Sequence, residues 1–291
     1  KVRAQRRHDQ RGQRGRGRHD RAEQRDHDHR HGKAHGPLDE TRQQARENAT
    51  TALPASVRVL FPSEFEFTDE LGWVPKGWEA ISLGEVCRRG GGDIQTGPFG
   101  SQLHASDYVE EGIPSIMPKN ITDNRLNTDE ISRITEEDAE RLAKYRVEVG
   151  DVVYSRRGDV EKRTLIRDDE DGWLCGTGCL RVRFGKNGLD SFFAACFLGT
   201  AASKQWVVRH AIGATMPNLN TGILGALPML LPNKETQIEF AEVVSSLDFR
   251  GTNALKESRK ISKLRDTLLP KLISGELRIP DAEKLVAQTR P

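Results

Sequence analysis

The chain has 291 residues, 35% of them hydrophobic and 30% charged, and its formal net charge at pH 7 is +2. This length allows one large domain or two modest ones. Residues 1–36 carry twelve basic side chains against five acidic ones, so the rest of the chain is mildly acidic and a basic surface over the whole molecule is excluded.

The first part of the chain offers little to bury. Residues 1–36 consist mainly of Arg, His, Gln, Asp and Gly and are expected to form a disordered, basic, low-complexity tail. Residues 37–73 are expected to act as a linker, and Trp73 and Trp78 frame a turn into the first strand of a domain that begins at residue 74. No apolar run could span a bilayer or form a signal peptide, so a cytoplasmic protein without membrane contact is expected.

The first informative loop is glycine-rich and reads GGGDIQTGPFGSQL, residues 90–103. Its glycines are expected to let the backbone approach another molecule closely. Gly97 and Pro98 predict a tight turn that directs Phe99 outward. The loop has neither the Gly-Lys-Ser/Thr end of a P-loop nor the partner acid of a dinucleotide fingerprint, so no cofactor is predicted.

A strand and a helix follow this loop. The strand is predicted at 112–117, with Lys119 and Asn120 at its end. The helix is predicted to begin at Thr135, which can cap it, and to end near Tyr145, because acids occupy its first turn and basic residues its last.

The densest basic cluster of the folded region lies in and after GDVVYSRRGD, residues 150–159. A strand is predicted at 152–154, followed by a turn. The turn is either a solvated hairpin tip or a set of donors facing phosphates or guanine, where one bidentate Arg contributes about 1–3 kcal/mol of discrimination. The cluster consists of Ser155, Arg156, Arg157, Lys162 and Arg163.

The next elements are strands at 173–184, helical structure at 191–211 and a last apolar strand at 224–231. The polar loop GATMPNLNT, residues 213–221, is expected to expose Asn218 and Asn220. Asn suits a bidentate pair with adenine, although in loops it more often serves the turn itself.

Residues 234–277 are predicted to form a long helix. Every seventh residue is apolar, at Phe240, Leu247, Ala254, Ile261 and Leu268. The second heptad position is apolar at Val243 and Leu264 but charged between them. Gly251 predicts a bend or break, Pro270 a kink and Gly275 a left-handed cap. The helix either packs on its own domain or, as the sustained period favours, projects and packs on another helix.

The four cysteines, Cys87, Cys175, Cys179 and Cys196, lack the paired spacing of a zinc site. The cysteines are therefore expected to be buried, reduced thiols, and no metal site is predicted.

Seven segments, in this order, resemble one half of the DNA-specificity (S) subunit of a type I restriction-modification system. They are PKGWEAISLGEV, IQTGPFGSQL, GIPSIMPKNI, VEVGDVVYSRRGDV, GCLRVRF, GATMPNLNTGILGALPMLLPNKETQ and LRDTLLPKLISGEL. The resemblance implies an α+β fold, in which a mixed α/β target-recognition domain at 74–232 is followed by a long C-terminal coiled-coil helical region at 233–279. Residues 280–291 are expected to be a flexible tail.

The resemblance also implies partners. The family usually carries two such halves, whose helices pair antiparallel and hold two recognition domains on a bipartite site. One half is expected to bind half of a double-stranded DNA target and to position methyltransferase and restriction subunits, without catalysis of its own. The helix would join it to a second copy or to a separately encoded half. The alternative is a scaffold that has lost DNA binding and keeps only the helical interaction.

Two sets of site residues follow from this comparison. The predicted DNA contacts are Gln95, Thr96, Phe99, Ser101, Lys119, Asn120, Ser155, Arg156, Arg157, Lys162, Arg163, Asn218 and Asn220. The predicted dimer or subunit interface is Phe240, Val243, Leu247, Ala254, Ile261, Leu264 and Leu268. No catalytic residues are predicted, because the Asn/Asp-Pro-Pro-Tyr segment of a methyltransferase is absent. Glu161 and Lys162 would point to opposite sides of a strand, which does not suit a nuclease site.

Overall fold

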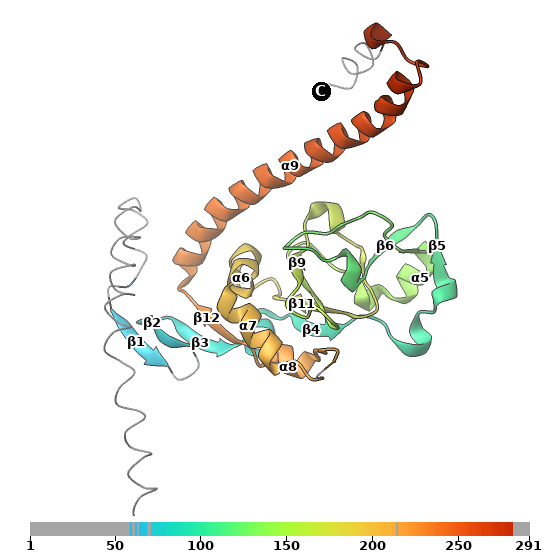
Figure 1. The fold of residues 1–291 in the computed structure, drawn as a ribbon. Helices are drawn as coiled ribbons and strands as arrows, with labels where there is room; N and C mark the ends of the chain where they lie inside the picture. The colour runs from blue at the N-terminus through green and yellow to red at the C-terminus, as the bar shows by residue number, and fades with distance from the viewer. Residues whose placement is uncertain (1–58, 60–61, 63, 69–70, 214, 282–291) are drawn as a thin grey trace, which may run out of the picture. The chain divides into compact units, whose positions relative to one another are not determined.

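The computed structural model describes residues 59, 62, 64–68, 71–213 and 215–281. In this part of the chain a mixed α/β domain precedes a long helix (Figure 1), which confirms the predicted fold class. The predicted tail at 1–36 and most of the predicted linker lie outside the described residues. No helix in the described ranges has both the length and the apolar character of a membrane span.

The strands form two larger sheets and two ribbons. They are β1 (Phe65–Thr68), β2 (Gly72–Pro75), β3 (Glu79–Ser82), β4 (Asp93–Thr96), β5 (Tyr108–Val109), β6 (Ile113–Ile116), β7 (Arg133–Ile134), β8 (Val152–Ser155), β9 (Arg163–Leu165), β10 (Leu174–Cys175), β11 (Cys179–Arg183) and β12 (Pro228–Leu231). The sheet orders are β4-β11-β8-β9, β10-β6-β7-β5, β1-β2 and β12-β3. The strand predicted at 224–231 begins only at residue 228, because Leu224 lies in a helix.

The α-helices are α4 (Leu83–Gly90), α5 (Glu136–Arg141), α6 (Ser191–Leu198), α7 (Ala201–His210), α8 (Thr221–Gly225) and α9 (Lys234–Ile273). Side-chain oxygens of Ser82, Thr135, Asp190, Thr200 and Asn233 accept backbone N–H groups at the starts of α4, α5, α6, α7 and α9. Thr135 is thus confirmed as a helix cap. The helix predicted after it ends at Arg141 and continues as the 3-10 turn Ala143–Tyr145.

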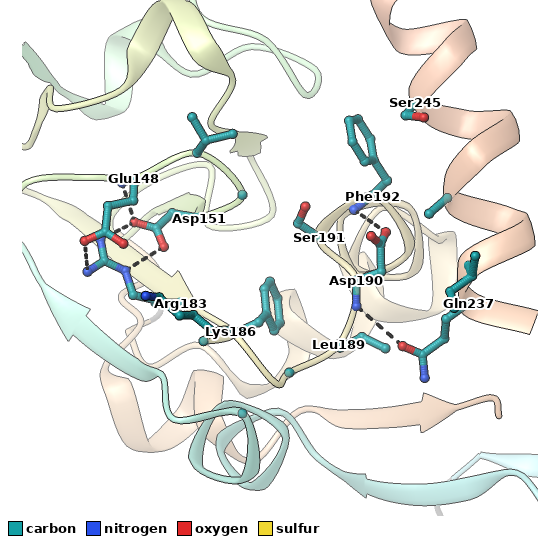
Figure 2. Close-up of a pocket in the computed structure, with 18 of the residues that line it drawn as sticks. Glu148, Asp151, Arg183, Lys186, Leu189, Asp190, Ser191, Phe192, Gln237 and Ser245 are labelled. Atoms are coloured by element: carbon teal, nitrogen blue, oxygen red, sulfur yellow. Dashed lines mark hydrogen bonds and ion pairs between the residues drawn. The ribbon is translucent and has the colours of Figure 1, made fainter. Parts of the chain in front are cut away.

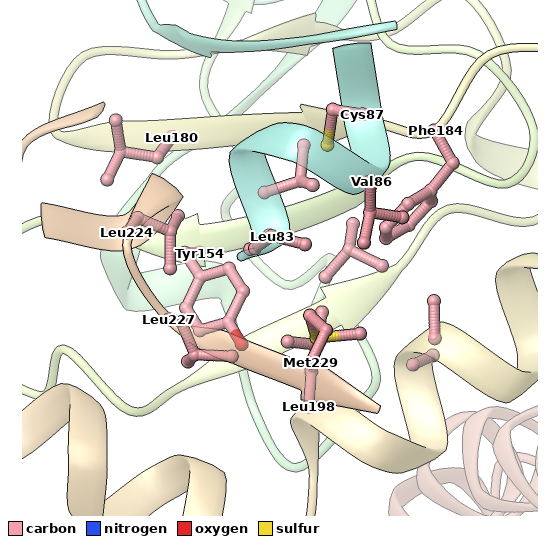
Figure 3. Packing of buried hydrophobic residues seen from close by; sticks show 14 of the residues in the cluster. Leu83, Val86, Cys87, Tyr154, Leu180, Phe184, Leu198, Leu224, Leu227 and Met229 are labelled. Carbon is pink, nitrogen blue, oxygen red and sulfur yellow. The ribbon is translucent and has the colours of Figure 1, made fainter. Parts of the chain in front are cut away.

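The central sheet is β4-β11-β8-β9, and it is buried on both faces. Its strands alternate, with Val152, Tyr154, Leu180 and Val182 entering the larger hydrophobic cluster shown in Figure 3. Val153 and Cys179 enter a second cluster. Because the side-chain period of a strand is two, a slip of one residue would exchange these faces. The register of the central strands is therefore tightly specified.

Helix α9 is unbroken over 40 residues, so the predicted break at Gly251 is wrong. Contacts from the domain reach the helix on both sides of this glycine, since Arg125 hydrogen-bonds Asp248 and Thr252. They support the helix at a position where Gly costs about 1 kcal/mol relative to Ala. Gly275 has a φ of +75° and its N–H donates to the Leu272 carbonyl oxygen (3.3 Å), which confirms the predicted cap.

The cysteines are all free, as predicted, but not all are buried. Cys87, Cys175 and Cys179 are buried, whereas Cys196 is exposed, so the prediction of burial is wrong for Cys196. Burial raises the pKa of Cys87 and of Cys175 to about 12. These two thiols stay protonated at neutral pH and are poor nucleophiles or metal ligands.

The glycine-rich segment packs against the chain itself. A Cβ atom at Gly90 or Gly92 would collide with the backbone of residues 183–188, and one at Gly97 with the carbonyl oxygen of Gly176. The prediction that these glycines serve the approach of another molecule is therefore wrong, because they are needed for internal packing.

Replacing Gly97 with Ala should lower the free energy of unfolding by about 1–3 kcal/mol, the usual range for overpacking. Denaturant unfolding followed by tryptophan fluorescence measures this change. Gly225→Ala is the matched control, since a Cβ there would lie 3.6 Å from Ile94, in ordinary contact. Equal unfolding midpoints for Gly97→Ala and the wild type would contradict the packing argument.

Replacing Gly251 with Ala should instead stabilise α9. The nearest atom to the added Cβ would be Arg125 Nη2 at 3.6 Å, an ordinary contact. Ala exceeds Gly in a helix interior by about 0.5–1 kcal/mol, so amide hydrogen exchange in α9 should slow accordingly. Faster amide exchange in the variant would contradict this prediction, because it would show that the added methyl group destabilises α9.

Candidate nucleic-acid interface

Several loops meet at one edge of the central sheet. The antiparallel registers bring together the end of β4 at Thr96, the end of β8 at Ser155 and the start of β11 at Cys179. β9 begins at the same edge, because Arg163 pairs with Tyr154. The glycine-rich loop, the basic turn and the turn before β11 are therefore neighbours in space, although they are far apart in sequence.

Hydrogen bonds join these loops. The Thr177 hydroxyl donates to the Pro98 carbonyl oxygen (3.0 Å), and the Arg156 N–H donates to the Gly178 carbonyl oxygen (2.8 Å). The Leu219 N–H donates to the Arg156 carbonyl oxygen (2.9 Å), which adds the loop between α7 and α8. The turn after β6 lies beside them, because β6 pairs with β10. We call this the loop surface, residues 97–103, 117–120, 155–162, 176–178, 212–213 and 215–220.

The loop surface exposes aromatic and cationic side chains. Phe99 is 58% exposed, as predicted for the tight turn. Ser101, Lys119, Arg157 and Lys162 are also exposed. Among the described residues no hydrogen bond or ion pair engages the guanidinium of Arg157, whereas Lys162 pairs with Asp159 at 2.6 Å. Exposed cations suit phosphates or base edges, and an exposed aromatic ring suits an apolar contact with bases.

Three predicted contact residues are buried and hold the loops instead. The Ser155 hydroxyl donates to the Arg157 carbonyl oxygen (2.9 Å), and the Asn120 amide bridges Met117 and Asn127. Arg163 is 5% exposed and donates to the Ala195 carbonyl oxygen (2.6 Å). Their side chains cannot reach a ligand without rearrangement, so the predicted DNA contacts at Ser155, Asn120 and Arg163 do not fit the structure.

Other predicted contacts are engaged locally. The Gln95 amide oxygen accepts from Arg181 (3.1 Å), and Asn220 caps α8 by accepting the Ile223 N–H (2.8 Å). The Asn218 backbone exchanges hydrogen bonds with Ile212 (3.0 and 2.9 Å). Asn220 thus caps a helix. Asn218 is half-buried, so its predicted exposure is wrong, and its Oδ1 is buried without a hydrogen-bond partner among the described residues. Thr96 and Arg156 are half-buried at the edge of the loop surface.

The structure adds residues that the sequence did not suggest. Thr177 joins the loop surface through its bond to Pro98, and Ile212 and Met216 expose 63% and 62% of their surface beside the basic turn. No local pattern marks them, because their place depends on pairing between the loop that contains them and residues 156–158.

The opposite ends of the same strands border a cleft of about 950 Å³ (Figure 2). Arg183 makes a bidentate pair there with Asp151 (2.9 and 2.7 Å). Burial raises the pKa of the Asp151 carboxyl despite the bonds from Arg183. The far wall of the cleft is the start of α9, where Gln237 accepts from the Asp190 N–H (3.5 Å). The loop surface and the start of α9 therefore lie at opposite ends of the central strands.

Among the described residues, no group of three or more His, Cys, Asp or Glu side chains could hold a metal ion. The loop surface exposes cations, hydroxyls and an aromatic ring, which can bind a polyanion, together with the carboxylate of Asp159, which pairs with Lys162.

Helix α9 presents two different faces. Phe240 packs on Phe193 of α6 with ring centroids 5.3 Å apart, so this predicted interface residue is half-buried against the core of its own domain. Val243, Leu247 and Ile261 are 58%, 59% and 60% exposed. At 100° per residue, these three and Ala254 lie about 100–140° around the helix from Asp248, which faces the domain. Leu264 and Leu268 continue this apolar stripe and are half-buried.

Comparison with known proteins gives the same assignment along the chain. Residues 75–265 match the family described as type I restriction modification DNA specificity domain. The type I restriction enzyme MjaVIII specificity subunit of Methanocaldococcus jannaschii is 23% identical over 214 residues, covering 72% of this chain and 48% of that protein. The MjaIX specificity subunit of the same organism is 23% identical over 225 residues, covering 75% and 49%. The chain spans about half the length of these curated relatives.

Solved structures of similar proteins include a type I S subunit from M. genitalium, at 20% identity and a TM-score of 0.49, covering 68% of this chain and 46% of that one. The HsdS subunit from Thermoanaerobacter tengcongensis has 20% identity and a TM-score of 0.45, covering 82% and 54%. Because the family match alone extends over well more than half of the residues, the chain belongs to the family of type I restriction-modification DNA specificity domains.

Proposed function

We propose that the chain reads one half of a bipartite DNA sequence with its loop surface and is joined to a second specificity half through α9. The observation that carries this proposal is the gathering of Phe99, Lys119, Arg156 and Arg157 at the edge of the central sheet opposite to the start of α9. In a type I complex the chain would position methyltransferase and restriction subunits and perform no catalysis itself.

The chemistry of the loop surface supports DNA as its ligand. Phosphate contacts from cations position a protein on a duplex, and a few base contacts from side chains such as Arg then specify the sequence. Outside residues 1–36 the chain is mildly acidic in sequence, so an attraction to DNA has to come from a local cluster of cations such as Arg156, Arg157 and Lys162.

The apolar stripe on α9 supports a helical partner. Leu247 and Ile261 each leave more than half of their surface exposed, and such side chains at heptad spacing are the pattern of a helix pair. The curated relatives are about twice as long as the matched region, which leaves room in them for a second half. The proposed partner of α9 is the helix of a second copy or of another specificity half.

Arg157→Ala should weaken binding to DNA about tenfold, with a smaller salt dependence, because an exposed Arg on the loop surface loses a phosphate or base contact. The DNA is a duplex selected by the wild-type chain from a random pool, and affinity is measured by fluorescence anisotropy at several salt concentrations.

Lys186→Ala is the matched control, since this exposed Lys borders the cleft at the other end of the strands. It should leave the affinity within about twofold. If the wild-type chain selects no sequence and Arg157→Ala binds bulk DNA unchanged, the DNA-reading proposal fails and the scaffold alternative is favoured.

Replacing Leu247 and Ile261 together with Glu should abolish association through α9, because two charges would enter the apolar stripe. Sedimentation velocity of the full chain, alone and with the second specificity half, measures this. The melting temperature of the domain should stay nearly unchanged, since both side chains are exposed. Val208→Glu, an equally exposed apolar position on α7, is the control. If the double variant associates as the wild type does, the interface does not include the apolar stripe of α9.

A further inference from the structure

The middle of α9 is attached to the domain by charged side chains, which the proposed function does not use. Arg167 donates from Nε to Asp248 Oδ2 and from Nη2 to Asp248 Oδ1, both at 2.7 Å. Arg125 donates from Nη2 to Asp248 Oδ1 (2.9 Å) and from Nη1 to the Thr252 hydroxyl (2.8 Å). One carboxylate of the helix is thus shared by two guanidinium groups of the domain.

We propose that this carboxylate, Asp248, fixes the angle at which the DNA-reading domain leaves α9, and so sets the separation of two reading surfaces in an assembly joined through α9. The second part rests on the proposed function. The first part concerns only the domain and its helix.

The attachment is well shielded and specific. The side chains of Arg167, Arg125 and Asp248 are 12%, 25% and 15% exposed. A bidentate Arg–carboxylate pair is directional, so it selects one orientation of the helix relative to the domain. An apolar contact is not directional and would allow the helix to slide. Further along, Lys256 pairs with Asp169, and Arg259 donates to the Leu126 carbonyl oxygen (3.1 Å). All helix residues of this contact lie on the domain side of α9.

Two attachment points define the direction of a rod. The first is the apolar contact of Phe240 with Phe193, and the second is Asp248, about 12 Å further along the helix axis. Leu268 lies about 42 Å from Phe240 along the helix. If the helix pivoted at Phe240 as a rigid rod and Asp248 moved sideways by about 1 Å, Leu268 would therefore move by about 3.5 Å. That displacement is about one base-pair step of B-DNA. A small increase in the mobility of Asp248 would therefore weaken the preference of the assembly for one separation of its two half-sites.

The charges around Asp248 keep it ionised at neutral pH. Partial burial raises the pKa of this carboxyl, but hydrogen bonds and charge from Arg167 and Arg125 outweigh that effect, and the pKa lies below its ordinary value of 3.8. Glu170 also faces both arginines and accepts the Arg167 N–H (2.9 Å). Since the pKa of Asp248 is lowered, its contribution is complete above the ordinary value and is lost only as the pH falls through the folded-state value. The contribution of Asp248 itself should therefore not vary with pH between about 5 and 8.

Spin labels test the first part directly. Cys196, which is exposed, is replaced by Ser, and labels are attached at Glu110→Cys in the domain and Lys263→Cys on α9, both exposed positions. Asp248→Asn should broaden the distance distribution at least twofold, and Asp248→Glu should partly restore it. Asp266→Asn is the matched control, because this helix carboxylate pairs only with the adjacent Arg265 among the described residues.

Spacing discrimination tests the second part. The full assembly should prefer its own half-site separation over separations one base pair longer or shorter, and Asp248→Asn should reduce this preference at least fivefold. Binding to a single half-site should stay within twofold of the wild type, which a general loss of folding would not allow.

Each outcome decides a part of the proposal. A distance distribution of Asp248→Asn equal to that of its parent overturns the positioning role, and a broadened distribution with unchanged spacing preference overturns the link to spacing. If Asp248→Asn does not fold, Arg125→Gln takes its place, because the Arg125 guanidinium bonds only to α9 among the described residues. Absence of any sequence-specific binding by the wild type would count against the proposed function, while the label distances would still decide the positioning role.

Discussion

The pairing of β11 with β8 is the constraint on which the rest of the structure depends. Leu180 and Tyr154 send their side chains to one hydrophobic cluster, while Cys179 and Val153 send theirs to another. A sheet buried on both faces tolerates no slip, because every residue would change sides. The two edges of the sheet, where these strands begin and end, are thereby fixed relative to each other. They are separated by the length of four or five residues of strand.

This fixed sheet separates two tasks. One edge carries the loops that expose Phe99 and Arg157, and the other carries the Asp151–Arg183 pair, the cleft and the start of α9. Loops at the first edge can differ in sequence without disturbing the attachment of the helix, since loop residues are mostly exposed. The buried Ser155 and Asn120 show the limit of this freedom, because their side chains hold the loop backbone.

Local patterns were enough to predict strands at 112–117, 152–154 and 173–184, the long helix, the cap at Thr135 and the exposure of Phe99, because each depends on neighbouring residues. Features that depend on distant partners could not be predicted. Arg163 is buried because Gly199 leaves room for its guanidinium and Ala195, 32 residues away, accepts its hydrogen bond. The partners of Asp248 lie 81 and 123 residues from it, and no spacing in α9 indicates them.

The division of α9 into a polar and an apolar face has a consequence for assembly. Apolar contacts are not directional, so a helix attached to its domain only through apolar residues could rotate and bury its heptad stripe against that domain. Charged groups at Asp248, Lys256 and Arg259 face the domain and are matched there by specific partners. Rotation would break these contacts and leave the mostly buried charges of Asp248 and Arg167 unpaired, which is costly. The polar attachment therefore keeps the stripe of Leu247 and Ile261 available to another helix.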